Sequence, residues 1–183
     1  MKELSLNILD VTENSVKAGA TLTEILIEET ADVLSLSIKD NGCGMTDEIE
    51  KSVVNPFYTT RTTRSVGLGI PLLKLAAEQT GGKISIESAT AEETSLHGTT
   101  VSATFYKNHI DFTPLGDIVS TVTTLIQGHP DTNFRYSHKT GRGEVSLDTR
   151  DLREVLEDVP LSSYEVLEWI RENLTEQYEN LKN

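Results

Sequence analysis

Residues 10–20 read DVTENSVKAGA, and residues 38–45 read IKDNGCGM. In the first stretch Asp10 and Asn14 are four apart in a predicted helix, so their side chains project from one face about one turn apart. The second stretch ends a predicted strand with an aspartate and a glycine-rich tract. Because this strand should pack beside the helix, we expect Asp40, Asn14 and a loop without bulky side chains to converge. Either stretch alone is equally typical of surface polar residues and a turn, so the order of motifs along the chain decides between these interpretations.

The pattern of apolar residues around these stretches predicts an α+β fold. Helical spacing or strand alternation indicates the following elements in order: a helix over 4–17, a hairpin of strands 23–28 and 33–39, an acidic helix opened by Thr46 and Asp47, a loop to 66, a helix from Gly67 to Gly81, and strands 83–87 and 99–106. Grouped antiparallel strands with helices between them favour a two-layer α/β sandwich in which helices cover one sheet face. The other face must be polar or covered by another segment.

The chain is expected to consist of a domain over 1–107 and a C-terminal extension over 108–183. In the extension, a wide apolar helical stripe ends at Gly128, strands over 133–138 and 144–148 form a second hairpin, and a terminal helix follows. We expect this helix-hairpin-helix extension to cover the open sheet face. A surface for a protein partner or a homodimer is the alternative.

Composition narrows the classes of function. The net charge of −13 is shared almost evenly along the chain, and this absence of a basic region argues against nucleic-acid binding. Cys43 is the only cysteine, so no intrachain disulfide is possible. Neither a signal peptide nor an apolar run long enough for a membrane helix is evident, so we expect a cytoplasmic protein without membrane contact.

Five segments in one order resemble the GHKL superfamily, which comprises gyrase, heat-shock chaperone ATPases, histidine kinases and MutL. Residues 10–20 resemble the N box of MutL-type ATPases, and residues 38–45 resemble the first glycine box. The other three are PFYTTR (56–61), similar to the segment before the ATP lid of histidine kinases; GLGI (67–70) with GGKISIES (81–88), similar to the second glycine box; and GTTV (98–101), similar to the closing strand. The resemblance implies a Bergerat, or histidine-kinase-like ATPase, fold that binds ATP with Mg²⁺.

The same resemblance assigns roles around the adenine base. The family's base-reading aspartate corresponds to Asp40, whose carboxylate can accept a hydrogen bond from the exocyclic amine of adenine, and Thr99 is expected to support it through a bound water. Gly42 and Gly44 allow the backbone to approach the purine, and Met45 closes the glycine box.

At the phosphate end, Asn14 corresponds to the family's magnesium residue, since Mg²⁺ suits one protein oxygen together with phosphates and waters. The start of the helix at Gly67, Leu68 and Gly69 offers free amides to phosphate. Lys17, Arg61 and Arg64 are further candidates for phosphate contact, although solvated surface charges are equally consistent with these three residues. Residues 58–66 are expected to form a lid that ATP orders.

The chemistry after binding is left open by the sequence. Asp10 aligns with the general-base glutamate of the hydrolases but is one methylene shorter, and Glu13 is a weaker candidate because it should turn away from the site. Histidine kinases also need an acceptor histidine on a helix, and the four histidines of this chain lie in predicted loops or strands. Three hypotheses therefore stand: a slow ATPase, a kinase that acts in trans like the anti-sigma serine kinases or as a histidine kinase catalytic subunit, and an ATP-dependent binding module whose lid signals occupancy to a partner. A regulatory binding module with weak ATPase activity is favoured.

Overall fold

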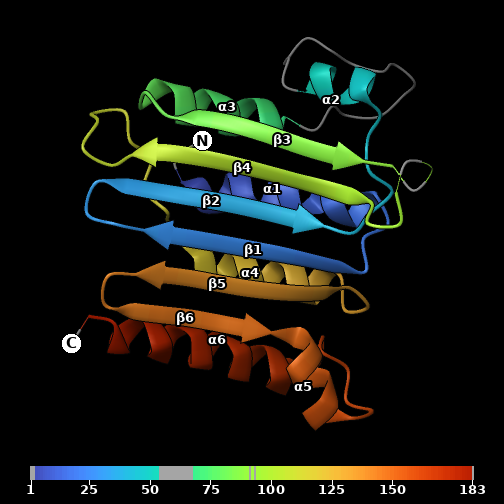
Figure 1. Cartoon of the computed structure of the whole chain (residues 1–183). Helices are drawn as coiled ribbons and strands as arrows, with labels where there is room; N and C mark the ends of the chain where they lie inside the picture. The colour runs from blue at the N-terminus through green and yellow to red at the C-terminus, as the bar shows by residue number, and fades with distance from the viewer. Residues whose placement is uncertain (1–2, 54–67, 91, 93, 183) are drawn as a thin grey trace.

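The computed structural model describes residues 3–53, 68–90, 92 and 94–182. Its helices and strands are α1 (Leu4–Lys17), β1 (Leu22–Glu29), β2 (Val33–Asp40), α2 (Asp47–Val53), α3 (Gly69–Gln79), β3 (Lys83–Ala89), β4 (Gly98–Tyr106), α4 (Ile118–Gly128), β5 (Asn133–Thr140), β6 (Gly143–Asp148), α5 (Thr149–Leu156) and α6 (Tyr164–Asn180). The six strands form one sheet in the order β3-β4-β2-β1-β5-β6 (Figure 1). β1 pairs with β5 in parallel, and the other neighbours pair antiparallel.

Helices α1, α3 and α4 lie on one face of this sheet (Figure 1). The strands alternate, so that every second side chain points toward these helices and is buried, as Ile25, Ile27, Leu36 and Phe105 are. Helix α1 packs between α3 and α4 and contributes Leu4, Ile8 and Val11 to the same core. The predicted two-layer α+β fold is therefore confirmed.

No helix or strand of the described residues covers the opposite, polar face of the sheet, which corrects the expectation that the C-terminal residues cover it. The strand register aligns three rows of side chains across all six strands on this face. The middle row consists of Ser85, Ser102, Ser37, Leu26, Ser137 and Ser146. The two outer rows are Lys83, Thr104, Ser35, Glu28, Lys139 and Glu144, and Glu87, Thr100, Lys39, Glu24, Arg135 and Asp148.

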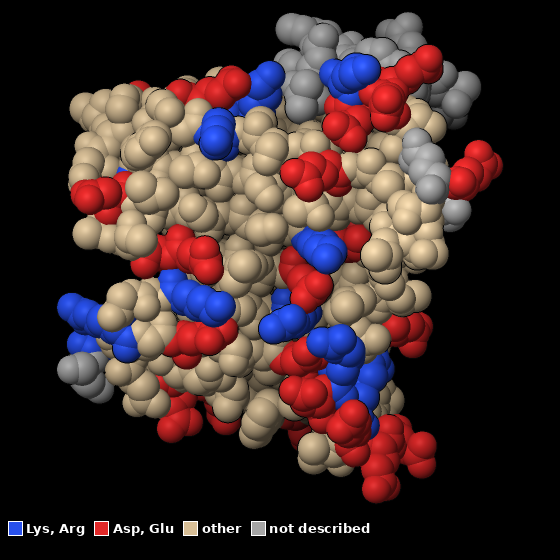
Figure 2. Space-filling view, in the orientation of Figure 1, with Lys and Arg blue, Asp and Glu red and all other residues tan. Residues whose placement is uncertain are grey.

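Opposite charges face one another across neighbouring strands in the outer rows, and Figure 2 shows acidic and basic side chains interspersed on this face. Arg135 Nη1 lies 3.0 Å from Glu24 Oε2 on the adjacent strand. Such cross-strand pairs and hydroxyls are well solvated, so this face needs no helical layer.

The C-terminal residues widen the sheet instead of covering it. β5 adds to the free edge of β1, β6 follows, and α6 packs against β6 and α4 (Figure 1). The Gln177 side chain accepts a hydrogen bond from the Ser146 amide at 2.9 Å and donates one to the Ser146 carbonyl at 3.1 Å. It thereby satisfies backbone groups on the outer edge of β6, where another strand would otherwise pair.

Some element bounds differ from the prediction. Helix α4 begins at Ile118, because the side chain of Asp117 accepts a hydrogen bond from the Ser120 amide and caps the helix there. The β5–β6 turn is tighter than expected, since the strands run to Thr140 and from Gly143. Helix α5 has only eight residues, which is too short for the spacing of apolar residues to predict it.

Candidate functional site

Asp40 ends β2 with its carboxylate pointing toward the helical layer, and its side chain is held from three directions. The residue is only 8% exposed. Its Oδ2 accepts a 2.7 Å hydrogen bond from the Ser15 hydroxyl, and its Oδ1 accepts bonds from the backbone amides of Gly42 at 2.8 Å and Thr99 at 3.3 Å. Hydrogen bonds to an ionised group are stronger than neutral ones, so this carboxylate has a fixed direction. A fixed acceptor of this kind can read a donor group on a ligand.

The glycine box leaves no room for a side chain at Gly42 or Gly44. Gly44 has a φ of 72°, and a Cβ built on it would lie 1.9 Å from the Ala89 carbonyl oxygen. A Cβ on Gly42 would lie 2.9 Å from the Cβ of Ala18 in the turn after α1. The Cys43 amide donates to the carbonyl of the same Ala18 at 2.9 Å. Glycine is therefore required for the box to reach both the N-box turn and β3.

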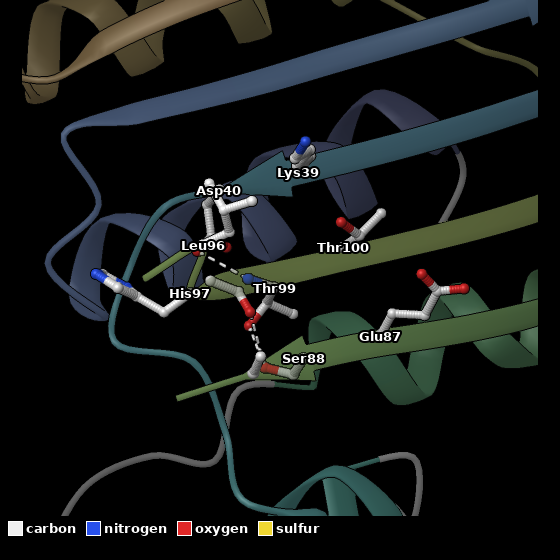
Figure 3. A pocket seen from close by; sticks show the side chains of 10 residues that line it. Lys39, Asp40, Glu87, Ser88, Leu96, His97, Thr99 and Thr100 are labelled. Atoms are coloured by element: carbon white, nitrogen blue, oxygen red, sulfur yellow. Dashed lines mark hydrogen bonds between the residues drawn. The ribbon is translucent and has the colours of Figure 1, made fainter. Parts of the chain in front are cut away.

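A hydroxyl pair connects the glycine box to the ends of β3 and β4. Ser88 Oγ and Thr99 Oγ1 are 2.8 Å apart, and Ser88 Oγ also accepts a bond from the Met45 amide at 2.8 Å. Beside them, His97 Nδ1 donates to the Gly42 carbonyl at 2.5 Å. Asp40, Ser88, His97 and Thr99 line an open pocket at the strand ends, together with Lys39, Glu87 and Thr100 of the opposite sheet face (Figure 3).

The other N-box residues lie along the face of α1 that approaches α3. Asn14 is half-buried, whereas Asp10 and Lys17 are exposed. A Cβ on Gly69 would lie 2.9 Å from the Cβ of Asp10, so the first turn of α3 contacts α1 at this residue. The structure therefore brings Asp10 to the start of α3, where the free amides of a helix attract anions.

The second glycine box is described only in part. Leu68 occupies the N-cap position of α3 and is exposed, and Gly69 is the first helical residue. The predicted site residues Arg61 and Gly67, together with Arg64 and the expected lid, lie outside the described residues.

Sequence reasoning missed Ser15, Ser88 and His97 as site residues. Ser15 follows Asn14 directly in the N box, so its place in a motif was the available signal. Ser88 ends the segment GGKISIES and His97 directly precedes GTTV, so these motifs were the available signal, but the contacts of both residues depend on the pairing of β3 with β4.

The donor set fits magnesium bound together with phosphates rather than a protein-only metal cage. Among the described residues, no group of three or more His, Cys, Asp or Glu side chains could hold a metal ion. The Asn14 amide would offer a single hard oxygen, and Mg²⁺ commonly takes one or two protein ligands beside phosphates and waters.

None of the described helices has the length and apolar character needed to cross a membrane.

Comparison with known proteins agrees with this geometry. The family described as histidine kinase-, DNA gyrase B- and HSP90-like ATPase matches residues 2–109. The tetrathionate sensor histidine kinase TtrS of Salmonella typhimurium is 32% identical over 98 residues, which are 54% of this chain and 16% of that protein. The DNA mismatch repair protein MutL of Listeria monocytogenes is 29% identical over 185 aligned residues, which cover 81% of this chain and 30% of that protein.

Among solved structures, the Aquifex aeolicus MutL ATPase domain complexed with ADP superimposes with a TM-score of 0.51 at 15% identity. That match covers 86% of this chain and 70% of the other, and at this identity it shows the fold. The chain belongs to the family of histidine kinase-, DNA gyrase B- and HSP90-like ATPases, and residues 2–109 form its GHKL-type ATP-binding module. The matched segments are small parts of the two curated relatives, so the whole activities of those proteins do not transfer.

Proposed function

We propose that this protein binds ATP with Mg²⁺ and acts as an ATP-dependent regulatory module with weak ATPase activity. The observation that carries the proposal is the Asp40 carboxylate, which is buried, held by Ser15, Gly42 and Thr99, and placed beside a loop that accommodates only glycine. A buried acceptor fixed in this way suits the exocyclic amine of adenine.

Asn14 and Lys17 would bind the phosphate end of the nucleotide. Neither side chain has a hydrogen-bond or ion-pair partner within the described part of the chain, so the amide oxygen of Asn14 is free for Mg²⁺ and the ammonium of Lys17 for a phosphate oxygen. A bound Mg²⁺ would neutralise part of the triphosphate charge and orient it. Thr99 would support the base through water, and the amides of Leu68 and Gly69 would face the phosphates.

Asp10 is the proposed general base. It lies four residues before Asn14 on the same face of α1 and beside the first turn of α3. The side chain of Glu13, by contrast, is bonded to His129 and is not available to a water at the phosphates. Because an aspartate reaches less far than a glutamate, slow turnover is expected.

Labelled ATP can separate the three hypotheses. The protein is incubated with γ-labelled ATP and Mg²⁺, alone and with a cell lysate, and bound nucleotide, free phosphate and labelled protein are measured. Tight binding with slow phosphate release supports the proposal. Transfer of label to a protein would instead identify a kinase, and failure to bind Mg-ATP at all would exclude the whole proposal.

The extension is proposed to be the part of the chain that contacts a protein partner or a second copy. A pull-down with and without Mg-ATP tests this, and size-exclusion chromatography with light scattering distinguishes a homodimer from a foreign partner.

A further inference from the structure

Helix α1 carries the N box, and its N-terminal end is held by residues beyond the family match. The Leu4 amide donates to the Pro114 carbonyl at 2.9 Å, and the Ser5 amide donates to the Leu115 carbonyl at 2.8 Å. The first amides of a helix have no partner within the helix, so these carbonyls satisfy groups that the helix cannot satisfy itself. The segment before α4 therefore caps α1.

The other half of α1 is held through a side chain. His129 follows the last residue of α4, and its Nε2 donates a 2.7 Å hydrogen bond to Glu13 Oε1. The two side chains are 25% and 32% exposed, so the contact is partly protected from water. The segment from Pro114 to His129 thus forms hydrogen bonds with the N-box helix at two places.

Glu13 lies among the residues proposed to contact the phosphates and Mg²⁺. It adjoins Asn14, lies three residues after Asp10 and precedes Lys17 by four. A glutamate four residues before a lysine in a helix readily forms an ion pair with it. In the structure this pair is not formed, because the Glu13 carboxylate is directed to His129. Lys17 consequently has no ion-pair partner within the described residues.

We infer that His129 is a positioning residue for the phosphate end of the nucleotide site. By binding Glu13, it keeps a carboxylate away from the triphosphate and leaves Lys17 free to contact a phosphate. This inference rests on the proposed Mg-ATP binding. Because His129 belongs to the C-terminal extension, displacement of α4 from α1 would release Glu13 and weaken Mg-ATP binding.

The test compares His129→Ala, His129→Gln, Glu13→Gln and the double variant His129→Ala/Glu13→Gln by calorimetry with Mg-ATP and with adenosine. His109→Ala is the matched control, since His109 is an exposed histidine close to Asp111 and far along the chain from the N box. Thermal unfolding checks that each variant folds. Titrations at about 0.05 M and about 1 M salt are compared, because salt screens a charge effect at the surface but not a packing defect.

We expect His129→Ala to weaken Mg-ATP binding roughly three- to fivefold at low salt while the affinity for adenosine is unchanged. His129→Gln retains a donor and should bind like the parent. The double variant should also recover the parent affinity, because the released side chain is then uncharged. At high salt the difference between His129→Ala and the parent should shrink.

Three results would overturn the role of His129: parent-like Mg-ATP affinity in His129→Ala, an equal loss for adenosine, or a double variant as weak as His129→Ala. A parent protein that binds no Mg-ATP would instead overturn the proposed function itself, so the two failures are distinguishable.

Discussion

The Ser15 hydroxyl donates a 2.7 Å hydrogen bond to Asp40 Oδ2, although the two residues are 25 positions apart in the chain. This contact joins the N-box helix to the end of β2. Since Gly42 and Thr99 hold Oδ1 from the other side, the carboxylate cannot turn without breaking bonds to three different elements or loops. The proposed base-reading carboxylate of Asp40 is thereby joined to the helix that carries Asn14, the proposed magnesium residue.

Asp40→Asn should abolish ATP binding and leave the fold intact. In this variant Oδ1 can still accept from Gly42 and Thr99, while Ser15 can rotate its hydroxyl to accept from the new amide, so we expect a stability loss of only about 1 kcal/mol. The ligand, however, meets a donor where it needs an acceptor. Calorimetric titration with ATP measures the effect. Glu87→Gln is the matched control, because it removes a carboxylate from a neighbouring row of the sheet but on the uncovered face. Normal ATP affinity in Asp40→Asn would remove Asp40 from its role.

The elements around the two glycine boxes could be predicted because their signals are local. The helix over 4–17 and the first hairpin follow from spacing and alternation within a few residues, and both match the structure closely. The parallel pairing of β1 with β5 joins segments about a hundred residues apart, and no local pattern indicates it. The sequence shows the polar residues of the uncovered face only as alternation within each strand. Their alignment into rows depends on the register of all six strands.

The same limit applies to the site. Asp40 and the glycines stand in motifs, whereas the bonds from Ser15, Ser88 and His97 that hold Asp40, Thr99 and Gly42 are tertiary contacts. The contact of Glu13 with His129 joins α1 to the end of α4, which has no recognisable motif. Sequence patterns therefore suggest the proposed ligand contacts, whereas the bonds that position Asp40 and the glycine box are defined by the tertiary structure.

Asn14→Ala should weaken binding of Mg-ATP far more than binding of adenosine. The amide is proposed to hold the cation, and adenosine has no phosphate that needs one. Titration of both ligands, with and without Mg²⁺, measures the difference. Asn108→Ala serves as the control, because Asn108 is exposed in the loop after β4, whereas Asn7 is buried and Asn41 Oδ1 accepts bonds from the Thr21 and Leu22 amides. Equal losses for both ligands would show that Asn14 shapes the pocket instead.

A buried histidine links β1, β5 and α6 at the other end of the sheet. His138 Nε2 donates to Glu29 Oε2 at 3.1 Å, and its Nδ1 lies 2.8 Å from the Tyr178 hydroxyl, which in turn bonds the Tyr136 hydroxyl. Lys107 Nζ lies 2.6 Å from the other oxygen of Glu29. Burial lowers the pKa of His138, against the opposing effect of Glu29, and Lys107 lowers it further. Burial also raises the pKa of Tyr178 to about 12, so this hydroxyl stays protonated.

The sign of the resulting pH dependence follows from the lowered pKa of His138. Between that value and the ordinary value of about 6.5, the unfolded chain binds more protons than the folded chain, so the free energy of unfolding rises with pH. The contribution is fully present above about pH 6.5 and is lost as the pH falls through the folded pKa. We therefore expect a lower urea midpoint at about pH 5.5 than at about pH 7.5, with a smaller difference in His138→Gln. His109→Gln is the control, and an equal pH difference in parent and His138→Gln would contradict the assignment.

Catalysis is the most direct test of Asp10. Its carboxylate is exposed beside the first turn of α3, so a longer side chain has room to extend toward a phosphate-bound water. Asp10→Glu should therefore hydrolyse ATP faster than the parent, and Asp10→Asn should lose the activity without losing binding. A general base typically contributes about 10² to 10⁴-fold, so the fall from parent to Asp10→Asn should be large.

Single-turnover hydrolysis, with ATP affinity measured in parallel, separates the loss of a base from the loss of a ligand contact. Glu28→Gln on the uncovered face removes the same charge far from α1 and should hydrolyse at the parent rate. If Asp10→Asn also hydrolyses at the parent rate, Asp10 is not the base, since no proton acceptor remains at that position. Its place beside Asn14 would then leave it a role in orienting the magnesium waters, and the protein would belong with the binding modules or kinases rather than the hydrolases.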